Sequence, residues 1–209
     1  RVVPITAKTL NQKEYIRDIV ENDVIFCTGP SGSGKSYIAA GIAANHIYRD
    51  EVDQIIVTRP LVCAGQDIGS LPGELDEKIK PYLLPMEENL KHFLGRDYYG
   101  KLFNDGRIRY EPLEVMRGAT FHEAYMILDE AQNCTLAQIK MFITRMGENS
   151  KVLINGDIRQ TDIKKFSGLL ECVDRLEGIE GVGVSRLYYE DIQRNGIIGR
   201  VLEALEEDY

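Results

Sequence analysis

The sequence predicts an α/β domain with a mainly parallel sheet and helices on both of its faces. Short β-rich runs alternate along the chain with segments of helical period, as in proteins whose parallel strands are joined by helices. The runs are apolar almost throughout, which is typical of strands covered on both faces. A glycine-rich loop follows the first of these runs and precedes a helical segment. These three observations together indicate the fold class.

Six segments are expected to form strands. They are rich in β-branched and aromatic residues and are separated by polar or glycine-containing turns. They span residues 24–28, 54–58, 107–111, 124–128, 151–155 and 184–189. The sequence shows no internal repeat and no linker-like change of composition, so we expect residues 1–209 to form one domain.

Three stretches between the strands have helical period. Apolar residues recur at helical intervals in residues 35–48 and again in residues 135–146, where Thr135 is expected to be the N-cap. The third stretch, residues 71–94, contains two prolines inside its helical pattern. It is therefore expected to form either two short helices or one kinked helix.

Composition and charge exclude several classes of protein. No apolar run approaches the roughly 18 residues that span a bilayer, and no signal-peptide pattern opens the sequence. The four cysteines lie far apart without a C-x-x-C pair, so we expect neither a zinc site nor disulfides, and we expect a cytoplasmic protein. The net charge of −8 excludes a generally basic coat for nucleic acid but leaves room for a local basic groove.

The glycine-rich loop has the G-x4-G-K-S pattern of a phosphate-binding P-loop. It comprises Gly29, Pro30, Ser31, Gly32, Ser33, Gly34, Lys35 and Ser36. Glycines allow successive backbone N–H groups to converge on phosphate oxygens, and the following helix adds its positive N-terminal end. We expect Lys35 to reach the β- and γ-phosphates and the Ser36 hydroxyl to bind Mg²⁺. The loop therefore predicts a nucleoside triphosphate site.

A pair of acids follows the fourth expected strand, in AYMILDEAQN. Asp129 comes at the end of the apolar run and fits the role of a ligand in the Mg²⁺ shell. Glu130 is placed to accept a proton from an attacking water or to orient that water. The pair favours hydrolysis over phosphoryl transfer to a second substrate.

A third polar element follows the next strand, in VLINGDIRQTD. Gly156 and Asp157 are expected to end the strand, and Gln160 follows within reach of a γ-phosphate. Gln160 is interpreted as a sensor of that phosphate or of its attacking water. The alternative is a simple turn.

With these motifs in place, the chain resembles the PhoH-like ATPases, which are relatives of the superfamily-one helicase motor core. The similar stretches are TLNQKEYI, GPSGSGKS, TRPLVCAGQDIGSLPGEL, KIKPYLLP, MRGATFHEAYMILDEAQNCT, MFITRMGENSKVLINGDIRQTD and DIQRNGIIGRVLEAL. The resemblance implies a RecA-like domain that uses ATP and Mg²⁺ and binds RNA or single-stranded nucleic acid. Two departures are Gln66, where family members often have Glu, and Asn195, where they commonly have His.

The resemblance also implies roles for single residues. Gln12 would read the adenine base, because an amide both donates and accepts hydrogen bonds; the alternative is a solvated glutamine. Arg59 follows a strand where helicase-like motors touch the nucleic-acid backbone, and a surface arginine without a ligand is the alternative. Phosphoryl transfer of this kind also calls for an arginine against the γ-phosphate, supplied by a neighbouring subunit or by a nearby element of the same chain. Arg194, or else Arg200, is the candidate, delivered between subunits of a cyclic homo-oligomer, for which the resemblance suggests a hexamer. The alternative for these arginines is a surface salt bridge.

Two other functions remain open from the sequence. A small-molecule or nucleoside kinase would use the same P-loop, although the paired acids count against it. A nucleotide-gated binding module would hydrolyse ATP only slowly.

Overall fold

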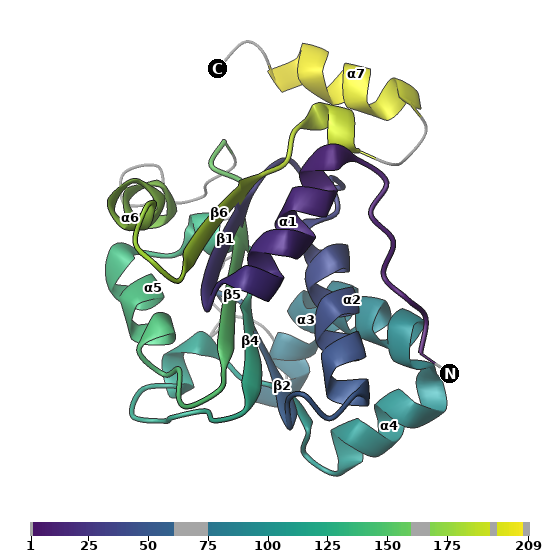
Figure 1. Cartoon of the computed structure of the whole chain (residues 1–209), viewed down its shortest axis with the longest axis vertical. Helices are drawn as coiled ribbons and strands as arrows, with labels where there is room; N and C mark the ends of the chain where they lie inside the picture. Colours follow the sequence, from purple (N-terminus) through teal and green to yellow (C-terminus); the bar gives the residue numbers. More distant parts are fainter. Residues whose placement is uncertain (1, 61–74, 160–167, 193–195, 207–209) are drawn as a thin grey trace.

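A parallel sheet runs through the computed structural model, which describes residues 2–60, 75–159, 168–192 and 196–206 (Figure 1). In these residues the strands are β1 (Val24–Thr28), β2 (Gln54–Thr58), β3 (Ile108–Tyr110), β4 (Ala124–Leu128), β5 (Lys151–Gly156) and β6 (Val182–Arg186). Their order across the sheet is β3-β2-β4-β5-β1-β6, and each neighbouring pair is parallel. The carboxyl ends of the strands therefore meet at one edge.

Helices cover both faces of this sheet, as the sequence predicted (Figure 1). One face carries α1 (Leu10–Glu21), α2 (Lys35–Tyr48), α3 (Leu75–Leu94) and α4 (Arg96–Asn104). The other face carries α5 (Leu136–Ile143) and α6 (Gly168–Leu176). Short 3₁₀ turns among the described residues are η2 (Leu113–Val115), η3 (Ala131–Asn133) and η4 (Tyr189–Asp191), and α7 (Gly196–Glu206) packs beside η4.

Alternate residues of each strand belong to two different cores. In β1, Ile25 and Cys27 contribute to the core under α1–α4, whereas Val24 and Phe26 contribute to the core under α5 and α6. All four side chains are buried. This arrangement explains why the strands are apolar at every position instead of at alternate ones.

The stretch with two prolines forms one helix, α3, which continues through Pro81 and Pro85. Its second half packs closely on α2, and Gly41 makes this approach possible. A Cβ atom at Gly41 would lie 2.8 Å from Cζ of Phe93. Buried apolar side chains of α3 hold the helix against α2, and this packing offsets the backbone hydrogen bonds that the prolines cannot donate.

The last strand differs from the predicted segment 184–189. It begins two residues earlier, at Val182, and ends at Arg186. The chain then turns into η4, because the Asp191 carboxylate accepts a hydrogen bond from the backbone N–H of Tyr188 at 2.7 Å. The apolar and aromatic character of residues 187–189 therefore belongs to this turn and not to the sheet.

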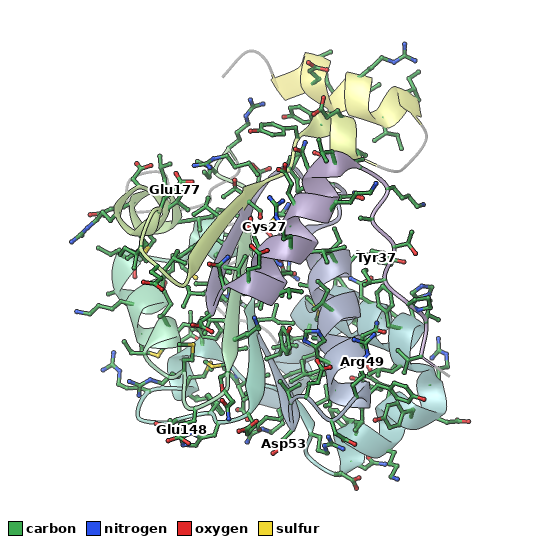
Figure 2. The ribbon with its side chains drawn as sticks, in the orientation of Figure 1. Cys27, Tyr37, Arg49, Asp53, Glu148 and Glu177 are labelled. Carbon is green, nitrogen blue, oxygen red and sulfur yellow. The ribbon has the colours of Figure 1, made fainter. Side chains whose placement is uncertain are left out.

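The direction of α2 places the glycine-rich loop at the carboxyl edge of the sheet. Figure 2 labels Tyr37 near the start of α2 and Arg49 just after its end, close to the opposite edge, where Asp53 and Glu148 lie. In the described part of the chain, no helix is both long and apolar enough to cross a membrane.

Candidate nucleotide-binding site

The glycine-rich loop connects β1 to α2 and is closely covered by neighbouring segments. A Cβ atom at Gly29 would lie 2.7 Å from the Leu187 carbonyl oxygen, so the loop can pass under the end of β6 only without a side chain there. Gly34 has φ +108°, a left-handed conformation that disfavours other residues, and it directly precedes α2. Steric crowding therefore requires glycine at position 29, and the left-handed backbone favours glycine at position 34.

The Lys35 side chain folds back over the loop that precedes it. Its Nζ atom donates hydrogen bonds to the carbonyl oxygens of Gly29 at 2.5 Å and of Pro30 at 2.9 Å. The ammonium group therefore lies over the loop, where the phosphates of a nucleotide are expected. Ser33 is buried, and its hydroxyl donates to the Pro30 carbonyl at 2.7 Å, which stabilises the turn.

Ser36 and Asp129 lie against each other, although 93 positions separate them in the sequence. The Ser36 hydroxyl is 3.0 Å from each carboxylate oxygen of Asp129. Burial raises the pKa of Asp129, and the neighbouring Glu130 raises it further, while Arg59 and the Ser36 hydrogen bond lower it. Mg²⁺ prefers such hard oxygen donors, and a cation here would offset the charge that burial disfavours. The residues present fit this ion.

Glu130 has an unusual backbone conformation at the point where β4 ends. Its φ and ψ are +54° and +40°, the left-handed region that few residues other than glycine adopt. Its carboxylate contacts two side chains: Arg59 Nη2 lies 3.4 Å from Oε1, and Gln132 Nε2 donates to Oε2 at 2.5 Å. The adjacent acids therefore have different main contacts, Asp129 with Ser36 of the P-loop and Glu130 with Arg59 and Gln132.

Gln132 connects the end of β4 to the end of β5. Its Oε1 atom accepts a hydrogen bond from the Asp157 backbone N–H at 3.0 Å, while its Nε2 holds Glu130. A Cβ atom at Gly156 would lie 2.9 Å from that Oε1, so glycine leaves the room that the amide occupies. The sequence interpretation missed this residue, although it lies only two positions after Glu130.

Gln12 lies against the P-loop, and its amide contacts other segments of the protein. Nε2 donates to the carbonyl oxygens of Ser33 at 2.9 Å and Asp191 at 3.2 Å, and Oε1 accepts from the Lys8 backbone N–H at 2.8 Å. The side chain is buried, unlike the solvated glutamine that was the alternative. Its role as an adenine reader stays a prediction. In that role the amide would give up some of these hydrogen bonds and form new ones with the adenine base.

A second unpredicted residue is the fully buried Asp191, from the short turn after β6. Its carboxylate accepts hydrogen bonds from the Thr9 hydroxyl, from Asn11 Nδ2 at 3.1 Å and from the Tyr188 backbone. Together with Gln12, it ties the start of α1 to the P-loop. An acid beside apolar and aromatic residues gives little signal in sequence, because an exposed acid has the same neighbours.

The structure thus brings together most of the residues that the sequence singled out. The P-loop, Asp129, Glu130 and Gln12 meet at the carboxyl edge of the sheet. Gln160 and Arg194 lie outside the described residues, and their roles stay predictions. Arg59 lies at the same edge and contacts Glu130. The sequence suggested a nucleic-acid contact or a surface arginine without a ligand, and it did not predict this ion pair.

Curated proteins similar to this chain are described as PhoH or PhoH-like. A family model described as "PhoH-like protein" matches residues 4–206. A PhoH-like protein of Bacillus subtilis (strain 168) is 42% identical over 205 residues, which cover 97% of this chain and 64% of that protein. Protein PhoH of Escherichia coli (strain K12) is 42% identical over 205 residues, covering 96% of this chain and 58% of that protein. The chain thus spans about three-fifths of the length of these curated relatives.

A solved structure resembles the fold at much lower sequence identity. The large terminase of a thermophilic bacteriophage superposes with a TM-score of 0.57 at 12% identity, covering 96% of this chain and 50% of that one. This likeness concerns the fold alone and agrees with the α/β P-loop NTPase fold, RecA-like, that the sequence predicted. By its family match and its relatives, the chain belongs to the PhoH-like protein family.

Proposed function

We propose that this chain is an ATPase that hydrolyses Mg²⁺-ATP and couples hydrolysis to binding or remodelling of RNA or single-stranded nucleic acid. The observation that carries the proposal is the contact of Ser36 with Asp129 at 3.0 Å, beside a second acid at the same strand end. This contact joins the two halves of a P-loop site. The chain's family membership supports the same activity.

Each residue of the site has a distinct task in this proposal. The backbone of residues 29–36 and the Lys35 ammonium bind the phosphates, while Ser36 and Asp129 hold Mg²⁺. When bound, that ion neutralises charge on the β- and γ-phosphates. Glu130 accepts a proton from the attacking water, and Gln160 contacts the γ-phosphate or that water.

The proposed nucleic-acid partner rests on a local feature and not on overall charge. The chain is acidic as a whole, with a net charge of −8, so a phosphodiester backbone would be attracted only at a local cation. Arg59 is such a cation, at the carboxyl end of β2 with a partly exposed side chain. The resemblance of the sequence to helicase motor cores also supports a nucleic-acid contact at Arg59.

The proposal extends to the organisation and location of the protein. Residues 1–209 form one domain and act in the cytoplasm, where reduced thiols persist. Cys27, Cys134 and Cys172 are buried thiols in the part of the chain that the structure describes. ATP, Mg²⁺ and a second copy of the chain complete the set of partners.

A phosphate-release assay with and without poly(U) RNA tests the proposal. The wild type should release phosphate without any acceptor molecule, and poly(U) should raise the rate. Lys35→Ala should lose turnover by roughly 10²-fold or more while keeping the fold, because phosphate charge is stabilised mainly by such fixed cations. Lys101→Ala, which removes an exposed lysine from α4, is the matched control and should match the wild type.

Each alternative function predicts a different result in the same assay. A kinase would release little phosphate until an acceptor is added, whereas a slow binding module would hydrolyse ATP at a rate that poly(U) does not change. Near-normal hydrolysis by Lys35→Ala would show that the P-loop has been misassigned.

A further inference from the structure

The carboxylate of Glu130 is engaged at both oxygens. Oε1 lies 3.4 Å from Arg59 Nη2, and Oε2 accepts a hydrogen bond from Gln132 Nε2 at 2.5 Å. A general base must place an oxygen within hydrogen-bond reach of the water that it deprotonates. In this arrangement the carboxylate is held toward the end of β2 and toward η3. These two contacts fix the direction of the carboxylate, so Glu130 must change at least one of them to turn toward a water on another side.

The two contacts differ in how easily they can be exchanged. Gln132 is buried, and its Oε1 is fixed by the Asp157 backbone N–H, so this amide cannot turn without breaking a second hydrogen bond. The Arg59 side chain is 20% exposed, and the Glu130 side chain is 39% exposed. The ion pair is therefore the member of the network that a ligand from solution can reach.

The residue before Arg59 is tied to the neighbouring strand, and the Arg59 side chain is the part that a ligand can contact. The Thr58 carbonyl accepts a hydrogen bond from the Asp129 N–H at 3.1 Å, which joins the ends of β2 and β4. Glu130, in contrast, has a left-handed backbone, and such a conformation persists only where surrounding contacts support it. Arg59 is one of those contacts.

We propose that Arg59 is a positioning residue that holds Glu130 in a resting state, and that a phosphodiester group of single-stranded nucleic acid releases Glu130 by binding Arg59. A guanidinium group binds carboxylates and phosphates with the same planar set of donors, so the two anions compete for it directly. Nucleic acid would thereby raise ATP hydrolysis without touching the P-loop. This inference rests on the proposed ATPase function and names how that site is regulated.

Steady-state kinetics of Arg59→Ala test this inference. Without nucleic acid, kcat should rise about fivefold, because an ion pair worth about 1 kcal/mol no longer favours the resting state. Poly(U) should raise the rate of the wild type but not of the variant. Arg59→Ala combined with Glu130→Gln should be as slow as Glu130→Gln alone, since the gain acts through Glu130.

Arg107→Ala is the matched control for a lost arginine. Arg107 forms an ion pair of similar length with Asp50, 3.7 Å, just before β3 and so at the opposite edge of the sheet, and its side chain is 33% exposed. This variant should keep the basal rate and the poly(U) response of the wild type. A fall in kcat in Arg59→Ala would instead show that Arg59 orients Glu130 for catalysis. An unchanged kcat with a retained response to poly(U) would overturn the inference as well.

A second measurement does not depend on hydrolysis. The NMR signal of the Arg59 Nε–H group, assigned by its loss in Arg59→Ala, should shift in Glu130→Gln and also when poly(U) is added to the wild type. If the protein hydrolyses no ATP but both shifts occur, the proposed ATPase function fails and the contact exchange stands. If hydrolysis occurs and responds to poly(U) but the signal does not move, the role of Arg59 is refuted and the ATPase remains.

Discussion

At the scale of single residues, the adjacent acids Asp129 and Glu130 have different surroundings. Asp129 is buried beside the P-loop, and burial is the main cause of its raised pKa. Glu130 is partly exposed and contacts a cation and an amide. Paired carboxylates in unlike surroundings can divide metal binding and proton transfer between them.

This division predicts different outcomes for the two amide substitutions. Glu130→Gln keeps size and hydrogen bonding but cannot accept a proton, so hydrolysis should fall by roughly 10²–10⁴-fold while Mg²⁺-ATP still binds. Asp129→Asn should weaken the part of ATP binding that depends on Mg²⁺. Phosphate release measures the fall in hydrolysis, and titration of a fluorescent ATP analogue, with and without Mg²⁺, measures binding by both variants. Loss of nucleotide binding in Glu130→Gln would assign that residue to the metal or to the fold instead.

His46 predicts a pH dependence of stability that is separate from the site. Burial lowers its pKa from the ordinary value of 6.5, and nearby Lys151 and Arg49 lower it too, while Glu51, 3.5 Å away, raises it. Below about pH 6.5 the unfolded chain takes up a proton that the folded protein binds less readily, so acidification costs stability. The Tyr125 hydroxyl, 2.5 Å from Nδ1, is a further contact of the ring.

The His46→Gln variant should therefore lose less stability than the wild type between about pH 7 and pH 5. Urea unfolding midpoints at several pH values measure the difference, and carboxylates that titrate in the same range contribute equally to both proteins. Parallel curves for the two proteins would show that His46 does not titrate differently on folding.

At the scale of elements, the sequence predicted what local patterns determine. β1, β2 and β4 have the bounds that the apolar runs indicated, and α2 spans residues 35–48 as expected. Thr135 forms the predicted N-cap, since its side chain accepts a hydrogen bond from the Gln138 N–H at 3.2 Å. Such signals are carried by a few neighbouring residues, so they can be read without the fold.

Contacts between distant segments could not be predicted in this way. The end of β6 depends on Asp191 binding the Tyr188 backbone, and the continuous α3 depends on its packing against α2. The positions of Gln132 and Arg59 around Glu130 depend on the order of the strands. Strand order is set by the whole sheet, so motifs indicated which residues belong to the candidate site but not how they contact one another.

The junction of α5 and α6 provides a prediction at this scale. A Cβ atom at Gly168 would lie 2.1 Å from the Leu136 backbone nitrogen, so α6 begins in direct contact with the start of α5. Gly168→Ala should lower the free energy of unfolding by about 1–3 kcal/mol, because backbone cannot move aside as a flexible side chain would. Chemical denaturation measures this change.

Gly100→Ala is the matched control for this substitution. Gly100 lies inside α4, and a Cβ atom there would meet nothing within 4 Å. Alanine should therefore raise the free energy of unfolding by up to about 1 kcal/mol through its better helix propensity. If both variants were destabilised alike, the loss of stability in Gly168→Ala would not be due to the contact with Leu136.

At the scale of the whole molecule, we expect the proposed site to use an arginine opposite the P-loop. Phosphoryl transfer in this class generally uses an arginine against the developing charge on the γ-phosphate, worth about 10³–10⁵ in rate. We expect that arginine to come from a neighbouring copy of the chain. A head-to-tail contact of this kind closes into a ring when its rotation allows.

The C-terminal segment supports such a contact. Helix α7 exposes three apolar side chains at intervals of four residues, namely Ile197, Val201 and Leu205, which lie on one side of the helix. Arg200 is also exposed on α7. An apolar stripe beside an arginine is the surface that a subunit contact would cover while delivering a cation.

Complementation between two inactive variants tests this assembly. Arg194→Ala should keep ATP binding and lose turnover, as Lys35→Ala loses turnover for a different reason. Mixing the two should restore part of the activity, because some interfaces then pair an intact P-loop with an intact arginine. Light scattering should give the mass of an oligomer, for which we expect a ring of six subunits, and activity should fall on dilution. If Arg194→Ala is fully active, the same test applies to Arg200→Ala; a fully active monomer would refute the ring.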